Sequence, residues 1–395
     1  GNTTFSGTVG GSEALGNTTI GTAILTGAAI KVQGTLAITN SGTSEIDGVI
    51  SDGASALALT KAGAGSLTLS GTNTYTGTST ISAGSIIIGA DAGLGAAPGS
   101  ASAGHFVFAS GGSGTLNTTA SFTLHANRGI ALTGNGIINA NASRTLTYAG
   151  VIAGSGTITK SGAGTLTLSG TNTHSGSNII SAGTLSVAGD RAFGAIPGST
   201  DADNVVFSSG GSGILNASGN FTLNTKRGIT LTGNGTIDVN NSRTLTYGGI
   251  ATGSSRLTKT SAGTLSLGGV NTYTGGTTIT LGTIILNGAN RLYSTGEIVF
   301  ANAAAILNLD GNHNTIGRIT GGGNSAQIQL GGGNLTINLP PAINGSFAGK
   351  ITGTGSFIKT GTGHQSLSNS THDYSGTTTI NAGTIKILSS SVLPD

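Results

Sequence analysis

The chain has 395 residues, of which 72 are Gly, while only 7% are charged and 4% aromatic; an average soluble domain is roughly 7% Gly and roughly 25% charged. It contains no Cys, Met or Trp, which excludes a disulfide framework, thiolate metal sites and thiol nucleophiles. A formal net charge of +3 is spread thinly over this length, so we expect no nucleic-acid-binding surface. Hydrophobic residues make up 36% and occur in short runs, so the chain is expected to fold.

The chain is divided by a long internal repeat. Residues 1–60 are expected to be the end of a preceding repeat, because Gly48-Val49-Ile50 matches Gly150-Val151-Ile152. A lysine then marks each repeat: Lys61, Lys160 and Lys259 are 99 residues apart, and Lys359 follows 100 residues later. We therefore predict a first repeat at 61–159, a second at 160–258, a divergent third at 259–358 and the start of a fourth at 359–395, all in one continuous solenoid.

Each repeat opens with the same motif. The segment LTKAGAGSLTLSGTNTY at 59–75 recurs with few changes at 158–174 and 257–273, and in degenerate form around 358–374. The first two repeats also match further on, since 126–130 recurs at 225–229. In the third repeat, Pro340-Pro341 and glycine clusters predict different loops between surviving strands.

A second, shorter period of about 20 residues runs inside each repeat, and it predicts one turn of a β-solenoid. Short segments such as Thr165–Leu168 and Thr236–Val239 alternate apolar and polar residues, which directs Leu, Ile and Val inward. Gly and Asn between them supply the positive φ that corners need. The fold class is therefore all-β, a parallel β-solenoid of about 20 coils of about 20 residues.

The motif Gly-x-Gly-x-Leu-Thr-Leu-Ser-Gly-x-Asn-Thr-Tyr-x-Gly at 63–77, repeated approximately at 162–176, resembles the passenger-associated transport repeat of bacterial autotransporter proteins. The whole layout is similar to passengers of large surface autotransporters such as the rickettsial surface antigens. The resemblance implies a right-handed parallel β-helix, exported to the extracellular face of the bacterial outer surface. Anchoring in the outer membrane is then expected only through a segment absent from this chain, which we interpret as an interior or matured piece.

Candidate catalytic residues are few. Polysaccharide-processing β-helices use clustered carboxylates, and the closest acidic groupings here are Glu45 with Asp47 and Asp201 with Asp203, which we interpret as solvated strand or turn residues. The six His residues are scattered without metal-ligand spacing. We therefore predict no enzyme, no catalytic, cofactor-binding or metal-binding residues, and no cofactor.

Recurring cations and rings are the candidates for a ligand-facing ladder. Cations spaced regularly along a solenoid could meet an anionic glycan or a lipopolysaccharide surface, or could be solvated residues copied by duplication. The rings, which share one register position with His174, could stack on a sugar or pack against the next coil. The candidates are Lys61, Lys160, Lys259, Lys359, Arg128, Arg227, Arg144, Arg243, Tyr75, Tyr273 and Tyr374.

The long duplication and the shortage of catalytic side chains predict a non-enzymatic extracellular protein, acting as an adhesin or rigid stalk of an autotransporter-like passenger. The expected partners are a host-cell or matrix surface, or a glycan. An alternative is a self-assembling subunit of an extracellular filament or biofilm matrix, associating end to end or laterally. A third interpretation is a polysaccharide-binding or polysaccharide-processing β-helix.

Overall fold

The structure is a computed structural model that describes residues 1–388 and 393. Its internal contacts divide the chain into two compact units: an N-terminal unit of Gly1–Ser186 with Arg191–Ala195, and a C-terminal unit of Val187–Asp190 with Ile196–Asp395. The chain winds through about 17 turns of about 22 residues, as a parallel β-solenoid. The predicted fold class is confirmed, with slightly fewer and longer turns than expected.

Most strands of the first half of the chain are short, and the three longest have 10 to 13 residues. In order they are β1 (Thr3–Phe5), β2 (Thr18–Thr22), β3 (Leu25–Gly27), β4 (Ile30–Asn40), β5 (Thr43–Ile46), β6 (Ile50–Ala62), β7 (Ser66–Leu69), β8 (Ser79–Ile81), β9 (Ser85–Ile88), β10 (Ser102–Phe108), β11 (Ser113–Thr118), β12 (Phe122–Leu124), β13 (Arg128–Leu132), β14 (Asn135–Ala140), β15 (Thr145–Tyr148), β16 (Ile152–Gly154), β17 (Ile158–Ser161), β18 (Thr165–Leu168) and β19 (Asn178–Val187). Two 3-10 helices, η1 (Asp91–Leu94) and η2 (Asp190–Phe193), follow β9 and β19.

The second half continues in the same manner. Its strands are β20 (Asp201–Ala217), β21 (Phe221–Leu223), β22 (Arg227–Leu231), β23 (Gly235–Val239), β24 (Thr244–Tyr247), β25 (Ala251–Gly253), β26 (Leu257–Thr260), β27 (Thr264–Leu267), β28 (Thr277–Ile279), β29 (Gly282–Leu286), β30 (Ile298–Phe300), β31 (Ala305–Asn308), β32 (Asn314–Ile316), β33 (Ile319–Gly321), β34 (Gln327–Gln329), β35 (Leu335–Asn338), β36 (Asn344–Phe347), β37 (Lys350–Gly353), β38 (Phe357–Thr360), β39 (His364–Leu367), β40 (Asp373–Tyr374), β41 (Thr378–Ile380) and β42 (Thr384–Ile387). Strand pairing continues through the divergent third repeat, where β33 pairs with both β30 and β36.

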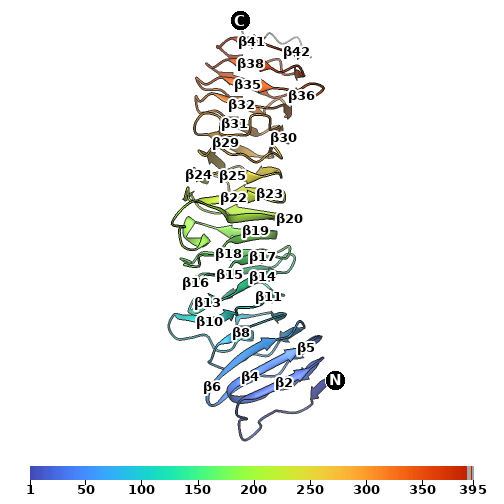
Figure 1. Ribbon diagram of the computed structural model, residues 1–395, viewed down its shortest axis with the longest axis vertical. Coiled ribbons are helices and arrows are strands. Elements are labelled where there is room, and N and C mark those ends of the chain that lie inside the picture. The colour runs from blue at the N-terminus through green and yellow to red at the C-terminus, as the bar shows by residue number, and fades with distance from the viewer. Residues whose placement is uncertain (389–392, 394–395) are drawn as a thin grey trace. The chain divides into compact units, whose positions relative to one another are not determined.

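Each strand pairs in parallel with the equivalent strand of the turns before and after it. In the N-terminal unit, Leu67 of β7 is in register with Ser44 of β5 and with Ile86 of β9. Figure 1 shows the corresponding strands of this unit, such as β8, β10 and β13, lying one above another. The same stacking in the C-terminal unit joins β27, β29 and β31.

The core is a narrow apolar stack. In the N-terminal unit, Leu67, Ile86, Leu116 and Ile138 are register partners from turn to turn, and each is at most 1% exposed. Most of the buried apolar side chains are Leu, Ile, Val or Ala, and Phe and Tyr occupy a minority of the buried positions. The turn after β9 is longer because it carries η1 and the loop up to β10, and such insertions account for the larger average turn.

Glycine is required where corners of adjacent turns meet. Gly63 has φ +74°, and a Cβ at this position would lie 2.3 Å from the carbonyl oxygen of Asn40 in the preceding turn. Both the left-handed backbone and this close approach exclude other residues. The high glycine content therefore follows from the stacking of corners.

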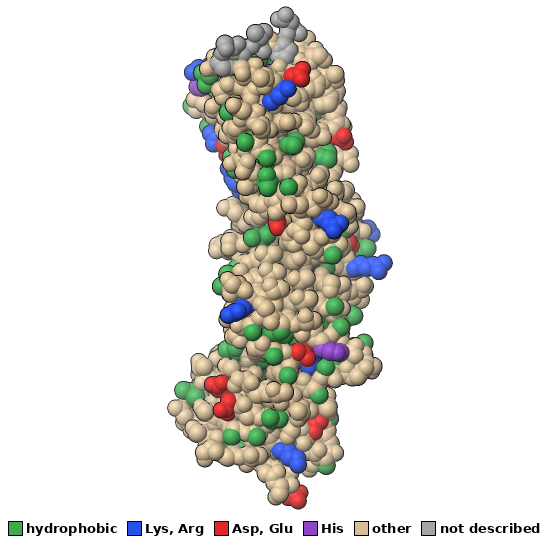
Figure 2. Space-filling model, turned by 180° about the vertical axis from the view of Figure 1, so that it is seen from behind, with side chains coloured by type: hydrophobic (Ala, Val, Ile, Leu, Met, Phe, Trp, Pro, Cys, Tyr) green, Lys and Arg blue, Asp and Glu red, His purple; other side chains and the backbone are tan. Residues whose placement is uncertain are grey.

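The surface carries few charges. On the face shown in Figure 2, Lys, Arg, Asp and Glu side chains are sparse among uncharged polar and apolar ones. None of the helices among residues 1–388 has the length or the apolar stretch that is needed to cross a membrane.

Candidate functional site

The four recurring lysines lie in the core. Their exposed fractions are 0% for Lys61, Lys259 and Lys359 and 1% for Lys160. Lys160 occupies an inward position of β17, two residues after buried Ile158, so strand alternation places it in the interior. The prediction that these lysines face a ligand is therefore wrong, and so is the alternative that they are solvated.

Each buried ammonium binds backbone carbonyl groups at a corner. Lys160 Nζ donates to the carbonyl oxygens of Ser161 at 2.6 Å, Gly162 at 2.8 Å and Ala182 at 3.0 Å. Two of these carbonyls belong to the corner that follows Lys160, and the third belongs to the next turn. The other three lysines make the equivalent contacts, with Ala83, Leu281 and Ala382 as the next-turn residues. The lysines therefore link consecutive corners.

These lysines predict an unusual pH dependence of stability. Burial lowers the pKa of Lys61, Lys160 and Lys259 from 10.5 to about 8. Between about pH 8 and about pH 10 the unfolded chain still holds a proton that the folded chain has released, so the free energy of unfolding is expected to rise with pH. Burial also raises the pKa of Tyr75 to about 12. Above about pH 10, unfolded tyrosine ionises first, and stability is expected to fall.

Urea unfolding at about pH 7.5, 8.5, 9.5 and 10.5 measures this profile. The expected result is a maximum of the unfolding free energy near pH 10. A profile that is flat or falls between about pH 8 and about pH 9.5 would contradict the assigned protonation of the lysines. Lys160→Met removes one titrating group and should reduce the slope in this window.

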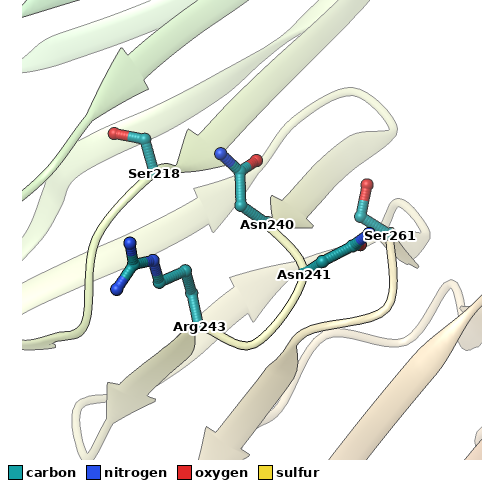
Figure 3. A pocket seen from close by; sticks show the side chains of 5 residues that line it. All are labelled: Ser218, Asn240, Asn241, Arg243 and Ser261. Carbon is teal, nitrogen blue, oxygen red and sulfur yellow. The ribbon is translucent and has the colours of Figure 1, made fainter.

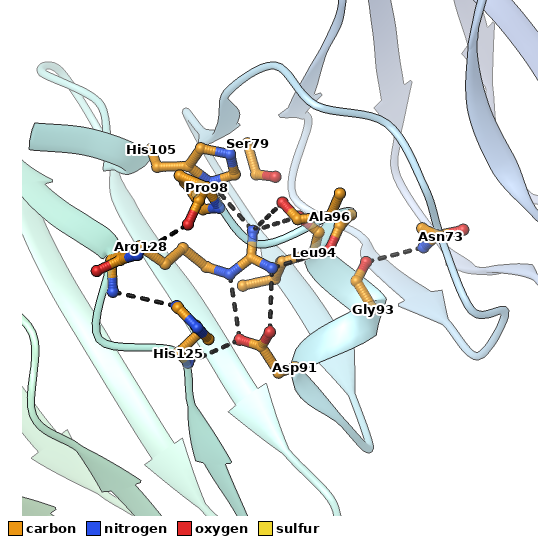
Figure 4. A network of polar contacts seen from close by, with 12 residues as sticks. Asn73, Ser79, Asp91, Gly93, Leu94, Ala96, Pro98, His105, His125 and Arg128 are labelled. Atoms are coloured by element: carbon orange, nitrogen blue, oxygen red, sulfur yellow. Dashed lines mark hydrogen bonds and ion pairs between the residues drawn. The ribbon is translucent and has the colours of Figure 1, made fainter. Parts of the chain in front are cut away.

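Arg128 is the centre of a second buried network (Figure 4). Its guanidinium is 0% exposed and binds both carboxylate oxygens of Asp91, at 3.1 Å each. It also donates to the carbonyl oxygens of Leu94 and Gly95, at 2.8 Å each. The His105 Nδ1 lies 3.0 Å from its Nη1. Because Asp91 to Gly95 spans η1 and its end, Arg128 fixes the long loop between β9 and β10 against β13.

The environment of His105 agrees with this arrangement. Burial and the positive charge of Arg128 both lower the pKa of His105. A neutral imidazole can accept a hydrogen bond from Arg128 at Nδ1, whereas a protonated one would place two cations in contact. His105 is therefore neutral in the folded protein near neutral pH.

The second repeat contains the same arginine with one change of partner. Arg227 is 0% exposed, and its Nε donates to Asp190 Oδ1 at 2.9 Å. Its Nη1 donates to Asn204 Oδ1 at 2.9 Å, where the first repeat has His105. Arg128 and Arg227 are thus structural, and the prediction that they face a ligand is wrong.

The three candidate tyrosines are also internal. Tyr75 and Tyr273 bond Ser79 and Thr277 through their hydroxyl groups, at 2.7 Å each. Tyr374 bonds Thr378 at 2.6 Å. Each tyrosine is at most 2% exposed, so the packing interpretation holds and sugar stacking at these rings is excluded.

Several structural residues were missed among the candidates. Asn172 accepts a hydrogen bond from the Ile152 N–H at 2.9 Å and donates to the Ala192 carbonyl at 2.7 Å, so it joins the turns on both sides. Asn73 makes the same pair of contacts in the first repeat. The recurrence of Asp91 as Asp190, at the same 99-residue offset as the arginines, was the available signal for the ion pairs.

Arg144 and Arg243 are the two candidates on the surface. Arg243 lines a shallow recess of about 440 Å³ with Ser218, Asn240, Asn241 and Ser261. Figure 3 shows these side chains on loops that follow β20, β23 and β26, with Arg243 and Asn240 projecting toward Ser218. Three consecutive corners of the C-terminal unit therefore supply the recess.

Two of the acidic candidates accept hydrogen bonds from neighbouring polar side chains. Glu45 accepts a hydrogen bond from Ser70 Oγ at 2.9 Å, and Asp201 from Asn204 Nδ2 at 3.3 Å. In the part of the chain that the structure describes, no group of three or more His, Asp or Glu side chains is arranged to hold a metal ion.

Comparison with known proteins identifies the repeats. The passenger-associated-transport-repeat family matches at 59–88, 158–187, 257–286 and 357–387. A curated relative, the autotransporter adhesin BmaC of Brucella suis biovar 1 (strain 1330), is 37% identical over 218 residues, which are 53% of this chain and 6% of the relative. The chain thus matches only a small part of that protein's length. No solved structure matches the chain.

Proposed function

We propose that this chain, which carries four passenger-associated-transport repeats, is a segment of the passenger of an autotransporter adhesin, displayed on the outer surface of a bacterium. The observation that carries the proposal is the similarity to the adhesin BmaC, which covers 53% of the chain. The segment supplies repeated solenoid turns, and contact with a host-cell surface, a matrix or a glycan occurs through exposed corners and faces.

The buried chemistry of the chain supports a non-enzymatic role. Nine of the eleven candidate residues are internal and bind the backbone or neighbouring side chains. Their cations hold corners and loops in place, as Lys160 and Arg128 do. A solenoid whose corners and loops are held at regular intervals by buried cations suits a protein that must present a surface away from the cell.

The test distinguishes the length that the segment adds to the passenger from direct contact of the segment with a host surface. In the parent protein, residues 59–387 are replaced by the same number of turns of an unrelated β-solenoid, and adhesion of the bacteria to cultured cells and to immobilised matrix is measured. We expect adhesion to fall although the length of the passenger is unchanged. Unchanged adhesion would reject a direct adhesive role and leave the segment as a stalk.

The purified 395-residue chain is used to test self-association. Sedimentation velocity over a range of concentrations is expected to show a single small species. Concentration-dependent growth into long assemblies would instead favour the filament subunit, in which solenoids stack through their strand edges.

A further inference from the structure

We propose that the recess around Arg243 binds an anionic glycan through its carboxylate or sulfate groups. The proposal rests on the adhesive function above and gives it a site and a ligand class. The recess is formed by corners of three consecutive turns, at 218–220, 240–243 and 261–263, in the C-terminal unit.

The backbone of the recess is fixed on both sides. The Arg243 N–H donates to the Asn240 carbonyl at 2.9 Å, and the Arg243 carbonyl accepts from the Thr264 N–H at 2.8 Å. The Thr244 N–H donates to Asn220 Oδ1 at 2.7 Å. The backbone of Arg243 is therefore held between two turns. Because it is already ordered, little backbone conformational entropy is lost when a ligand binds.

The two side-chain amide oxygens of the recess each accept a hydrogen bond. Asn240 Oδ1 accepts from Asn216 Nδ2 at 2.7 Å, and Asn241 Oδ1 accepts from the Ala262 N–H at 3.1 Å. The nearby carboxylate of Asp238 is bound by Asn216 Nδ2 at 2.8 Å and by Thr260 Oγ at 3.0 Å. The open side is therefore rich in donors, beside the serine hydroxyl groups, which can donate or accept.

These donors have no partner within residues 1–388. They are the guanidinium of Arg243, the Nδ2 groups of Asn240 and Asn241, and the hydroxyl of Ser261. A guanidinium binds a carboxylate or sulfate with two parallel hydrogen bonds. The amide and hydroxyl groups can donate to the remaining oxygens of the same group and to ring hydroxyls. A cluster of donors around one cation therefore selects an anionic sugar over a neutral one.

The first repeat contains a natural control for this site. Arg144 occupies the position of Arg243, is exposed, and follows Asn141 as Arg243 follows Asn240. However, Ala142 stands where the recess has Asn241, and Gly162 stands where it has Ser261. The two corners thus share the cation and differ in the added donors and in one neighbouring side chain, since Asn139 stands where the second repeat has Asp238.

Isothermal titration of the purified chain tests the site, with a heparin-derived hexasaccharide, an oligogalacturonate hexasaccharide and uncharged cellohexaose as probes, at about 0.15 M salt. We expect binding of at least one anionic probe and none of cellohexaose. The probe that binds distinguishes sulfate from carboxylate as the recognised group.

Three variants locate the binding. Arg243→Ala is expected to weaken the affinity at least about tenfold, and Arg144→Ala less than about twofold, although both remove one surface charge. Asn241→Ala with Ser261→Gly keeps the charge and gives the corner residues already found in the first repeat, and it should weaken binding about threefold to tenfold.

Equal losses in Arg243→Ala and Arg144→Ala would overturn the proposal, since they would indicate diffuse charge attraction. Absence of binding to both anionic probes would overturn it as well, and would leave the adhesive function untouched if the solenoid replacement still abolishes adhesion. If the chain binds a glycan but its replacement leaves bacterial adhesion unchanged, the adhesive function is rejected and the glycan site is retained.

Discussion

Replacement of Arg128 with Ala lowers the free energy of unfolding of the N-terminal unit by about 3–5 kcal/mol, the usual cost of removing one partner of a buried ion pair. The variant leaves the Asp91 carboxylate, 24% exposed, without its cation. It also leaves the carbonyl groups of Leu94 and Gly95 without their guanidinium donors. Urea unfolding followed by circular dichroism measures the loss.

Arg144→Ala is the matched control for Arg128→Ala, because the Arg144 side chain is exposed and should change stability by less than about 0.5 kcal/mol. The loop between β9 and β10 provides a local readout. Limited proteolysis is expected to cleave 89–101 faster in Arg128→Ala than in the control. Similar stability and similar cleavage of the two variants would show that the ion pair does not hold the loop.

Lys160→Met has the second largest expected effect. Two effects oppose each other: the variant relieves the cost of burying an ammonium, which is several kcal/mol, but it leaves the carbonyl groups of Ser161, Gly162 and Ala182 without this donor. Each unsatisfied buried acceptor costs about 1–3 kcal/mol. Since three carbonyls converge on one point, their loss outweighs the gain, and we expect a net destabilisation of about 2–4 kcal/mol.

The comparison variant is Lys226→Met. The Lys226 side chain is exposed and makes one hydrogen bond, to the Gly198 carbonyl at 2.8 Å, so its loss should cost less than about 0.5 kcal/mol. Both variants are measured by urea unfolding at about pH 7. If Lys160→Met is neutral or stabilising, the cost of burying the ammonium exceeds the stabilisation from its three hydrogen bonds, and the lysine is kept at a cost to stability.

The recurring lysines show how a charged side chain can mislead a prediction from sequence. In β17, Ile158 and Lys160 alternate with Thr159 and Ser161, so the period of two that predicts the strand also predicts an inward lysine. The general rule that an unpaired charge is rarely buried predicts the opposite, an outward Lys160. This rule led to the wrong prediction. The compensating partners are backbone carbonyls, which leave no trace in side-chain composition, and one of them lies 22 residues further along the chain.

The recess around Arg243 was predictable only in part. The exposure of Arg243 follows from its place in a polar corner between β23 and β24. The donors beside it do not follow, because Ser218 and Ser261 belong to the turns before and after. Which residues of neighbouring turns lie beside Arg243 depends on the number of residues in each turn. This number varies wherever a turn carries an insertion such as η1, so the neighbours cannot be counted off along the sequence.

By itself the sequence determined the parallel β-solenoid and its long repeat, because a 99-residue duplication and alternating strands are local and periodic signals. It also carries four segments that match the passenger-associated-transport-repeat family. The tertiary structure decided which polar groups are internal, as for Lys160 and Arg128, and which converge on the surface, as around Arg243. The physical reason is that stacking places corners of successive turns in contact. Carbonyl groups and side chains about one turn apart in sequence then become neighbours, and only their geometry shows whether they bind a buried cation or remain open to a ligand.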